Sequence, residues 1–231
     1  MSAGRSQPAP DETRALDGGA IASRLRRFLE PRASAQVRER CEFCGEPVPA
    51  GHSHVANLET RGIACACRPC YLLFTSRGAA GGKLVAIPDR YAVARELGMT
   101  SAEWDALQIP VGIAFFFVNS AQGRTVAFYP SPAGATESLL PLDAWDGLAG
   151  RDPLVASLAP DVEALLARRR RDGVVECYVV PIDACYELVG RMRRVWKGFD
   201  GGEEGWAEID AFFALVRERS GEPAVPAGGG E

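Results

Sequence analysis

The sequence predicts a protein of the α+β class, in which a small cysteine-rich module is followed by a mixed sheet domain with packed helices. Two observations predict this arrangement. Five of the seven cysteines and both histidines fall between Cys41 and Cys70. Beyond Gly82 the chain instead alternates β-branched or aromatic runs with amphipathic stretches. A chain of 231 residues is long enough to bury a core and to carry such an appendage.

Composition divides the chain into five expected segments. Both ends are rich in Pro, Ala and Gly and lack periodicity, which predicts disordered tails. A glycine-rich stretch, Arg77–Gly82, marks the expected boundary between two folded parts. The segments are a disordered tail over 1–18, a short helix and linker over 19–40, the cysteine-rich module over 41–76, the α+β domain over 83–219 and a second tail over 220–231.

Within the module, the residues that can ligate a metal follow an order typical of metal sites. The order is Cys41-x2-Cys44, then His52-Ser-His54, and then Cys65-x-Cys67-x2-Cys70. The two Cys-x2-Cys pairs are separated by 22 residues, which is close to the two-knuckle spacing of zinc ribbons and rubredoxin-like modules. Each pair is expected to form a tight turn, and Gly45 follows the first pair as such turns often require.

The sequence thus predicts one metal ion held by four thiolates, which makes the segment over 41–76 a metal-binding module. Four thiolates satisfy the tetrahedral preference of a d10 ion and leave no open position, as in a structural site. Zinc is the expected ion, and a single iron or a [2Fe–2S] cluster is the alternative, because four cysteines also hold these. The expected ligands are Cys41, Cys44, Cys67 and Cys70.

The other residues of this kind leave alternatives open. Cys65 can replace Cys67 in the set of four. His52 and His54 can complete a second, weaker site with Cys65. For the two histidines, ordinary polar residues of an exposed loop are the favoured interpretation, because prolines and a glycine precede them closely.

Four runs of the larger domain predict strands, and one segment is ambiguous. Val111–Val118 and Arg124–Tyr129 should form a hairpin. The first of these, with three consecutive phenylalanines, should be a central strand covered on both faces. Val162–Arg168 fits either a strand or a helix. The four strand predictions are Lys83–Ile87, Val111–Val118, Arg124–Tyr129 and Val174–Val180.

Helices should pack against this sheet. Thr100 and Glu103 form a capping box that opens a short helix. Leu142–Leu148 has a helical pattern, and Asp183 is the expected N-cap of a further helix with one apolar face. A last helix should place Trp206 to Val216 on one stripe.

Bulk properties argue against several classes of protein. The net charge is −4 and the chain beyond Gly82 is acidic, so nucleic acid is not an expected partner. No apolar run approaches the ~20 residues that cross a bilayer, and the N-terminus lacks the apolar stretch of a secretory signal. We therefore expect a cytoplasmic protein, where thiols stay reduced and clustered cysteines favour metal binding over disulfides.

The sequence does not predict an enzyme. Both histidines lie in the cysteine-rich module, so the larger domain has none for a catalytic set. Cys177 and Cys185 are expected to pack in the core, because neither has a neighbouring partner that would activate a thiol. An enzyme with a pocket near Tyr129, Glu137 or Asp143 is kept as an alternative.

Several runs of the sequence resemble an uncharacterised bacterial family of unassigned function, whose genes tend to lie beside those for nickel–iron hydrogenases. The resemblance covers about residues 35–218 and is carried by the cysteine and histidine motifs together with Ile109–Phe117, Ala127–Ser138 and Trp196–Glu204. It implies an accessory role in hydrogenase assembly or electron handling, with a hydrogenase subunit or maturation factor as protein partner. It supplies no activity and no catalytic residues. The leading prediction is therefore a zinc-binding accessory protein, and the alternative is a rubredoxin-like or iron–sulfur electron-transfer protein.

Overall fold

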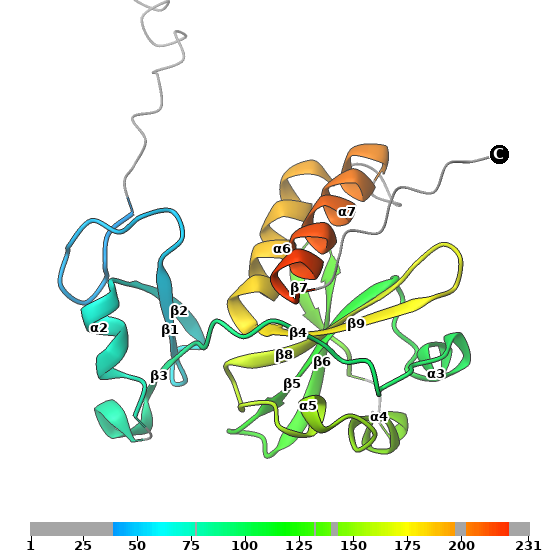
Figure 1. The fold of residues 1–231 in the computed structure, drawn as a ribbon, viewed down its shortest axis with the longest axis horizontal. Helices are drawn as coiled ribbons and strands as arrows, with labels where there is room; N and C mark the ends of the chain where they lie inside the picture. The colour runs from blue at the N-terminus through cyan, green and yellow to red at the C-terminus, as the bar shows by residue number, and fades with distance from the viewer. Residues whose placement is uncertain (1–38, 77, 132, 140–142, 197–201, 222–231) are drawn as a thin grey trace, which may run out of the picture. The chain divides into compact units, whose positions relative to one another are not determined.

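The computed structural model describes residues 39–221 except for 77, 132, 140–142 and 197–201 (Figure 1). The chain divides into two compact units, Met1–Arg38 and Glu39–Glu231, and all described residues belong to the second. The tail expected over 1–18 lies outside the described residues, as do most of the segment expected over 19–40 and most of the tail expected over 220–231.

Two antiparallel β-sheets form the framework of the described chain, which confirms the predicted α+β class. The smaller sheet has the order β2–β1–β3, with β1 at Ser53–Asn57, β2 at Gly62–Ala66 and β3 at Leu84–Ala86. The larger sheet has the order β4–β9–β8–β5–β6–β7, and so has six strands where the sequence suggested four or five. Its strands are β4 Ala92–Val93, β5 Ile113–Asn119, β6 Arg124–Ser131, β7 Gly134–Glu137, β8 Glu163–Arg169 and β9 Val175–Pro181.

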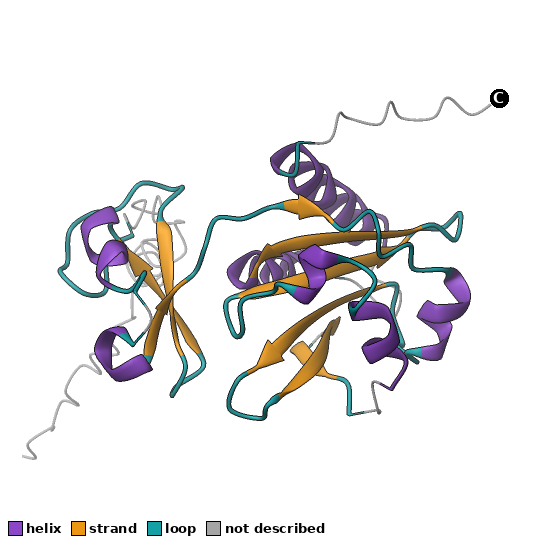
Figure 2. Ribbon diagram, turned by 60° about the horizontal axis from the view of Figure 1, so that its bottom comes forward, coloured by secondary structure: helices purple, strands orange, loops and turns teal. Residues whose placement is uncertain are grey.

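Helices cover both faces of the larger sheet (Figure 2). On one face lie α6 (Ile182–Val195) and α7 (Gly202–Arg219), whose apolar residues join a first buried cluster. The short helices α3, α4 and α5 supply apolar side chains to a second cluster on the other face. Their bounds are α3 Ser101–Ala106, α4 Asp143–Ala149 and α5 Pro153–Ala156. Both arms of the predicted capping box are present at the start of α3.

Strand β5 is the centre of the larger sheet, as its three phenylalanines predict. It pairs with β6 on one side, which confirms the hairpin, and with β8 on the other. Alternate side chains point to opposite faces of a strand, so Phe115 and Phe117 enter the first cluster while Phe116 enters the second. The strand is therefore covered on both faces.

The ambiguous segment Val162–Arg168 is a strand. It forms most of β8, which pairs along its length with β9 and also with β5. Its composition does not favour a strand, but six of the seven residues of β8 are buried between two neighbouring strands, and this packing overrides local preference.

Two details differ from the sequence predictions. The segment Lys83–Ile87 does form a strand, but this strand, β3, pairs with β1 of the smaller sheet and not with the larger sheet. Helix α6 begins two residues earlier than expected, with Pro181 as its N-cap, so Asp183 lies in the first turn and not at the cap. Its carboxylate is thereby free to face another element, β1.

Candidate metal centre

Two local structures bring the first four cysteines together. Cys41 and Cys44 lie in a turn before β1, where Gly45 adopts a φ of 78° and donates its backbone N–H to the Cys41 carbonyl oxygen at 2.8 Å. Only glycine takes up this left-handed backbone at no cost, so the first knuckle has the predicted form. The second pair differs from the prediction of another tight turn. Cys67 is the N-cap of α2 (Arg68–Leu73), and Cys70 lies in the first turn of that helix.

The four sulfur atoms of Cys41, Cys44, Cys67 and Cys70, which we call the cysteine quartet, all lie within 4.8 Å of one another. The Sγ atoms of Cys44 and Cys67 are 3.6 Å apart. Sulfurs at ~2.3 Å from one tetrahedral ion are about 3.8 Å apart, whereas a disulfide requires about 2.0 Å. All four thiols are free, and the quartet is therefore compact enough to hold one metal ion.

Backbone N–H groups, burial and neighbouring sulfurs together set the pKa values of the quartet thiols. Burial opposes ionisation of the Cys41 thiol, but backbone N–H groups, of Cys67 first, outweigh burial and lower its pKa to about 6. The Cys67 sulfur, together with burial, raises the pKa of Cys70 to about 12. Four adjacent thiolates repel one another, so full ionisation requires a cation among them, and a divalent metal supplies that charge.

Cys65 does not belong to the quartet. Its Sγ groups with His52 and His54, and one ligand atom of each of the three lies within 4.8 Å of the others. We call these three residues the histidine–cysteine group. Two hydrogen bonds to Glu42 hold Cys65 in place: the Cys65 N–H donates to the Glu42 carboxylate at 2.7 Å, and the Glu42 N–H donates to the Cys65 carbonyl oxygen at 2.9 Å.

The two histidines are less exposed than the polar loop residues that the sequence favoured. His54 lies in β1, and its Nδ1 is 2.7 Å from the Asp183 carboxylate. This carboxylate raises the pKa of His54, against the opposing effect of burial. The side chain of His52 is only 5% exposed, and its Nδ1 lies 2.8 Å from the carbonyl oxygen of Pro49. Sequence reasoning did not identify Asp183 as a partner of this group.

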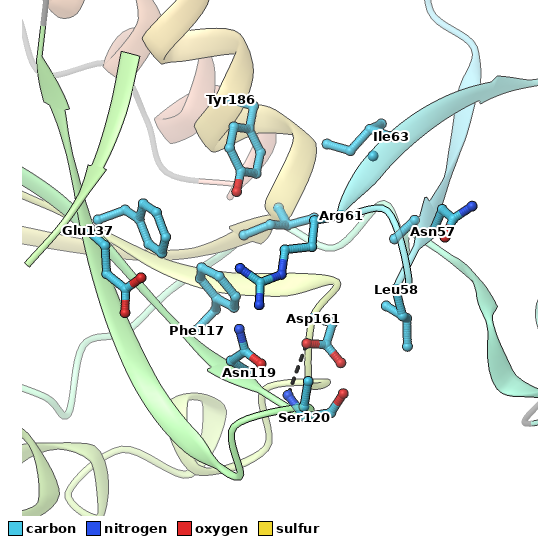
Figure 3. A pocket seen from close by; sticks show the side chains of 15 residues that line it. Asn57, Leu58, Arg61, Ile63, Phe117, Asn119, Ser120, Glu137, Asp161 and Tyr186 are labelled. Atoms are coloured by element: carbon cyan, nitrogen blue, oxygen red, sulfur yellow. Dashed lines mark hydrogen bonds between the residues drawn. The ribbon is translucent and has the colours of Figure 1, made fainter. Parts of the chain in front are cut away.

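Two hollows adjoin the smaller sheet. A cavity of about 610 Å³ is lined by both histidines and by residues of α6 that include Asp183 and Tyr186. A smaller one of about 110 Å³ is drawn in Figure 3, where Arg61 extends from the β1–β2 turn toward Asn119 and Asp161.

Of the residues proposed for an enzyme pocket, the two whose side chains are described, Tyr129 and Glu137, lie in different surroundings. Glu137 lines the smaller pocket, where Figure 3 shows it across from Arg61, and it forms an ion pair with Arg124 at 3.1 Å. Tyr129 instead packs against the second buried cluster, and the side chain of Asp143 lies outside the described residues.

The two remaining cysteines are core residues, as predicted. Cys177 is 7% exposed and Cys185 is fully buried. Burial raises the pKa of the Cys177 thiol to about 12 and that of Cys185 well above its ordinary value. Thiols that stay protonated are poor nucleophiles and poor metal ligands.

Among the described residues, no helix has both the length and the apolar character required to cross a membrane.

Comparison with models of protein families places most of the chain in a family. Residues 40–220 fit the model of a family of unknown function (DUF5947). This agrees with the resemblance to an uncharacterised family, and says nothing of neighbouring hydrogenase genes. No curated protein and no solved structure matched the chain significantly.

Proposed function

The chain belongs to the family of unknown function DUF5947, and because that family has no activity to transfer, we propose from the cysteine quartet that the protein is a zinc-binding accessory protein. The observation that carries this proposal is the mutual approach of four free thiols within 4.8 Å. Four thiolates complete a tetrahedral shell, so the ion has a structural role and no open position for a substrate.

The compactness of the quartet favours a single ion. In a [2Fe–2S] cluster the thiolates on different irons are separated by a second metal and by bridging sulfides, which places them further apart than around one ion. Between single ions, zinc is the usual occupant of closed four-thiolate sites. A rubredoxin-type iron has the same ligand set and is the second candidate.

The smaller sheet has little core of its own, which gives the ion a folding role. Between residues 39 and 76, the buried side chains are small and few. They are Cys41, Val48, Val55, Ala56 and Ala66. Small modules with so little apolar burial usually require a metal or a disulfide to stay folded. The zinc ion would therefore hold the knuckle, β2 and α2 together.

An exposed apolar patch next to the quartet supports docking to a protein. The patch consists of Phe43, Leu72 and Leu73, which are 37%, 50% and 67% exposed. Phe43 lies between the two cysteines of the first pair, and the leucines follow the second pair along α2. An ion that fixes both pairs would therefore also fix the patch. The Phe43 ring contacts that of Phe74, the residue after α2, with centroids 4.9 Å apart, so the first knuckle lies beside the end of that helix. Exposed apolar groups gathered in one region often mark interaction sites.

The partner follows only from the resemblance, which implies a nickel–iron hydrogenase subunit or a maturation factor. This part of the proposal stays a prediction, as does a cytoplasmic location.

Elemental analysis of the purified chain tests the metal. We expect zinc in the wild type and its loss from the quartet in Cys70→Ser, with no change in Cys185→Ala, a control that removes a thiol from the core. Iron in place of zinc, with visible absorption, would favour electron transfer. A quartet variant with unchanged metal content contradicts the proposed ligand set.

A further inference from the structure

We propose that His52, His54 and Cys65 form a second zinc site, separate from the cysteine quartet, with one coordination position open to the 610 Å³ cavity. The site uses none of the quartet sulfurs. It therefore goes beyond the structural role proposed for the quartet.

Strand geometry brings the three ligands together. Cys65 on β2 is the register partner of His54 on β1, and directly opposed residues of an antiparallel pair point to the same face. His52 comes two residues before His54, and side chains two apart share one side of an extended chain. The two imidazole rings accordingly lie with their centroids 4.6 Å apart.

Each imidazole is held in the tautomer that suits a metal ligand. The Nδ1 of His52 faces the Pro49 carbonyl oxygen at 2.8 Å, and a carbonyl oxygen only accepts, so this nitrogen carries the proton. The Nδ1 of His54 faces the Asp183 carboxylate at 2.7 Å, which likewise accepts a proton donor. In both rings the free lone pair is then on Nε2. A histidine fixed by an oxygen behind it is the usual arrangement at metal sites.

An unsatisfied ring nitrogen points to the missing ligand. The Nε2 of His52 is buried and has no hydrogen-bond partner among the described residues. The whole side chain is only 5% exposed. Buried polar atoms without partners are uncommon in proteins. A zinc ion at this nitrogen would satisfy it without any rearrangement of the Pro49 contact.

The donor set and the cavity define the kind of site. Two imidazoles and one thiolate are a borderline set that suits zinc. Three protein ligands leave the fourth tetrahedral position for water or a small anion, as in zinc sites that bind a substrate. Both histidines line the cavity, so the fourth position would open into it, and water is the expected occupant because four carboxylates line the cavity beside its two arginines.

Zinc counting on the full chain tests the proposal. Zinc-free protein is titrated with Zn²⁺ against a chromophoric chelator, and the ions bound per chain are counted. We expect two ions in the wild type and in Cys185→Ala, and one in Cys65→Ser and in His54→Gln. A single ion in the wild type overturns the second site, as do two ions in both substituted proteins.

Cobalt gives a readout that requires no substitution. When Co²⁺ replaces zinc in the wild type, thiolate-to-cobalt absorption should be strong for one equivalent and weak for the other, because one site has four thiolates and the other has one. Two equivalents with equal thiolate absorption contradict the proposed ligands. Weak thiolate absorption for every bound equivalent would contradict the quartet ligands while supporting the second site.

Asp183 should act as a positioning residue for His54. Asp183→Asn keeps the side-chain shape but weakens the acceptor, and loss of such a partner commonly costs about 10–100-fold in metal affinity. We expect that loss for the second ion only, with the affinity of the quartet unchanged. Equal affinities in Asp183→Asn and the wild type contradict this role.

Discussion

The larger sheet is buried by apolar side chains on both faces, whereas the smaller sheet lies beside a group of cysteines and has little core of its own. Phe115 and Phe116 of β5 are fully buried on opposite faces, and each joins a large cluster. Of the smaller sheet, only Ala56 of β1 is buried in the first cluster, with Ile87 just after β3, while Ile63 of β2 and Val85 of β3 pack against it and stay partly exposed. With zinc in the quartet, as proposed, the chain would stabilise its two sheets by different means, apolar burial in one and metal ligation in the other.

The largest expected effect is the loss of one quartet ligand. Cys70→Ser should remove the zinc ion of the quartet and unfold the smaller sheet, which would also release an ion held by the histidine–cysteine group, because structural zinc contributes on the order of 10 kcal/mol to small modules. Two-dimensional NMR of the labelled chain would show this as the loss of dispersed signals from β1 and β2. Dispersed signals from these strands in metal-free Cys70→Ser would contradict the claim that the smaller sheet depends on zinc for its fold.

The second effect lies in the larger sheet. Phe116 is fully buried and stacks on Trp145, with ring centroids 4.3 Å apart. Phe116→Ala should therefore cost about 3–5 kcal/mol of unfolding free energy. Chemical denaturation measures that cost, and zinc content should stay at the wild-type level. A fall in zinc content would mean that the two sheets do not depend on separate sources of stability.

A smaller effect is expected from a cysteine that is not a ligand. Cys185 is fully buried in the first cluster, so Cys185→Ala should cost about 1–2 kcal/mol through lost packing. Metal content and unfolding free energy should both be measured in Cys185→Ala. Destabilisation with full metal content is the expected pair of results, and lost metal would show that Cys185 has another role.

The smallest effect on stability should come from the apolar patch. Leu73 is 67% exposed, so Leu73→Asp should change the unfolding free energy by less than about 0.5 kcal/mol. The same substitution should weaken binding to the host's purified hydrogenase subunits or maturation factors. Val174, which is 52% exposed on the larger domain, gives the matched control Val174→Asp. Equal binding by the two variants counts against docking through the patch.

Local spacing was enough to predict the quartet and much of the larger sheet. The two Cys-x2-Cys pairs, the capping box of Thr100 and the phenylalanine run of β5 are encoded within short stretches. Ligand spacing and strand alternation are short-range signals, which is why a single sequence reveals them.

The histidine–cysteine group could not be predicted from local sequence patterns, because its residues meet through contacts between distant parts of the chain. His54 meets Cys65 only through the register of β1 with β2, and it meets Asp183 across 129 residues of sequence. Strand pairing is set by the whole fold, so the sequence left Cys65 among alternatives. The same reason explains β3, whose partner sheet could not be read from its own residues.

Hydrogen–deuterium exchange of the wild-type chain, before and after zinc removal, tests the central claim most directly. We predict that backbone amides of β1, β2 and α2 lose protection when zinc is removed, while those of β5, β8 and β9 keep it. Protection that survives zinc removal throughout the smaller sheet would contradict a structural zinc site, and its loss from both sheets together would contradict their separate stabilisation.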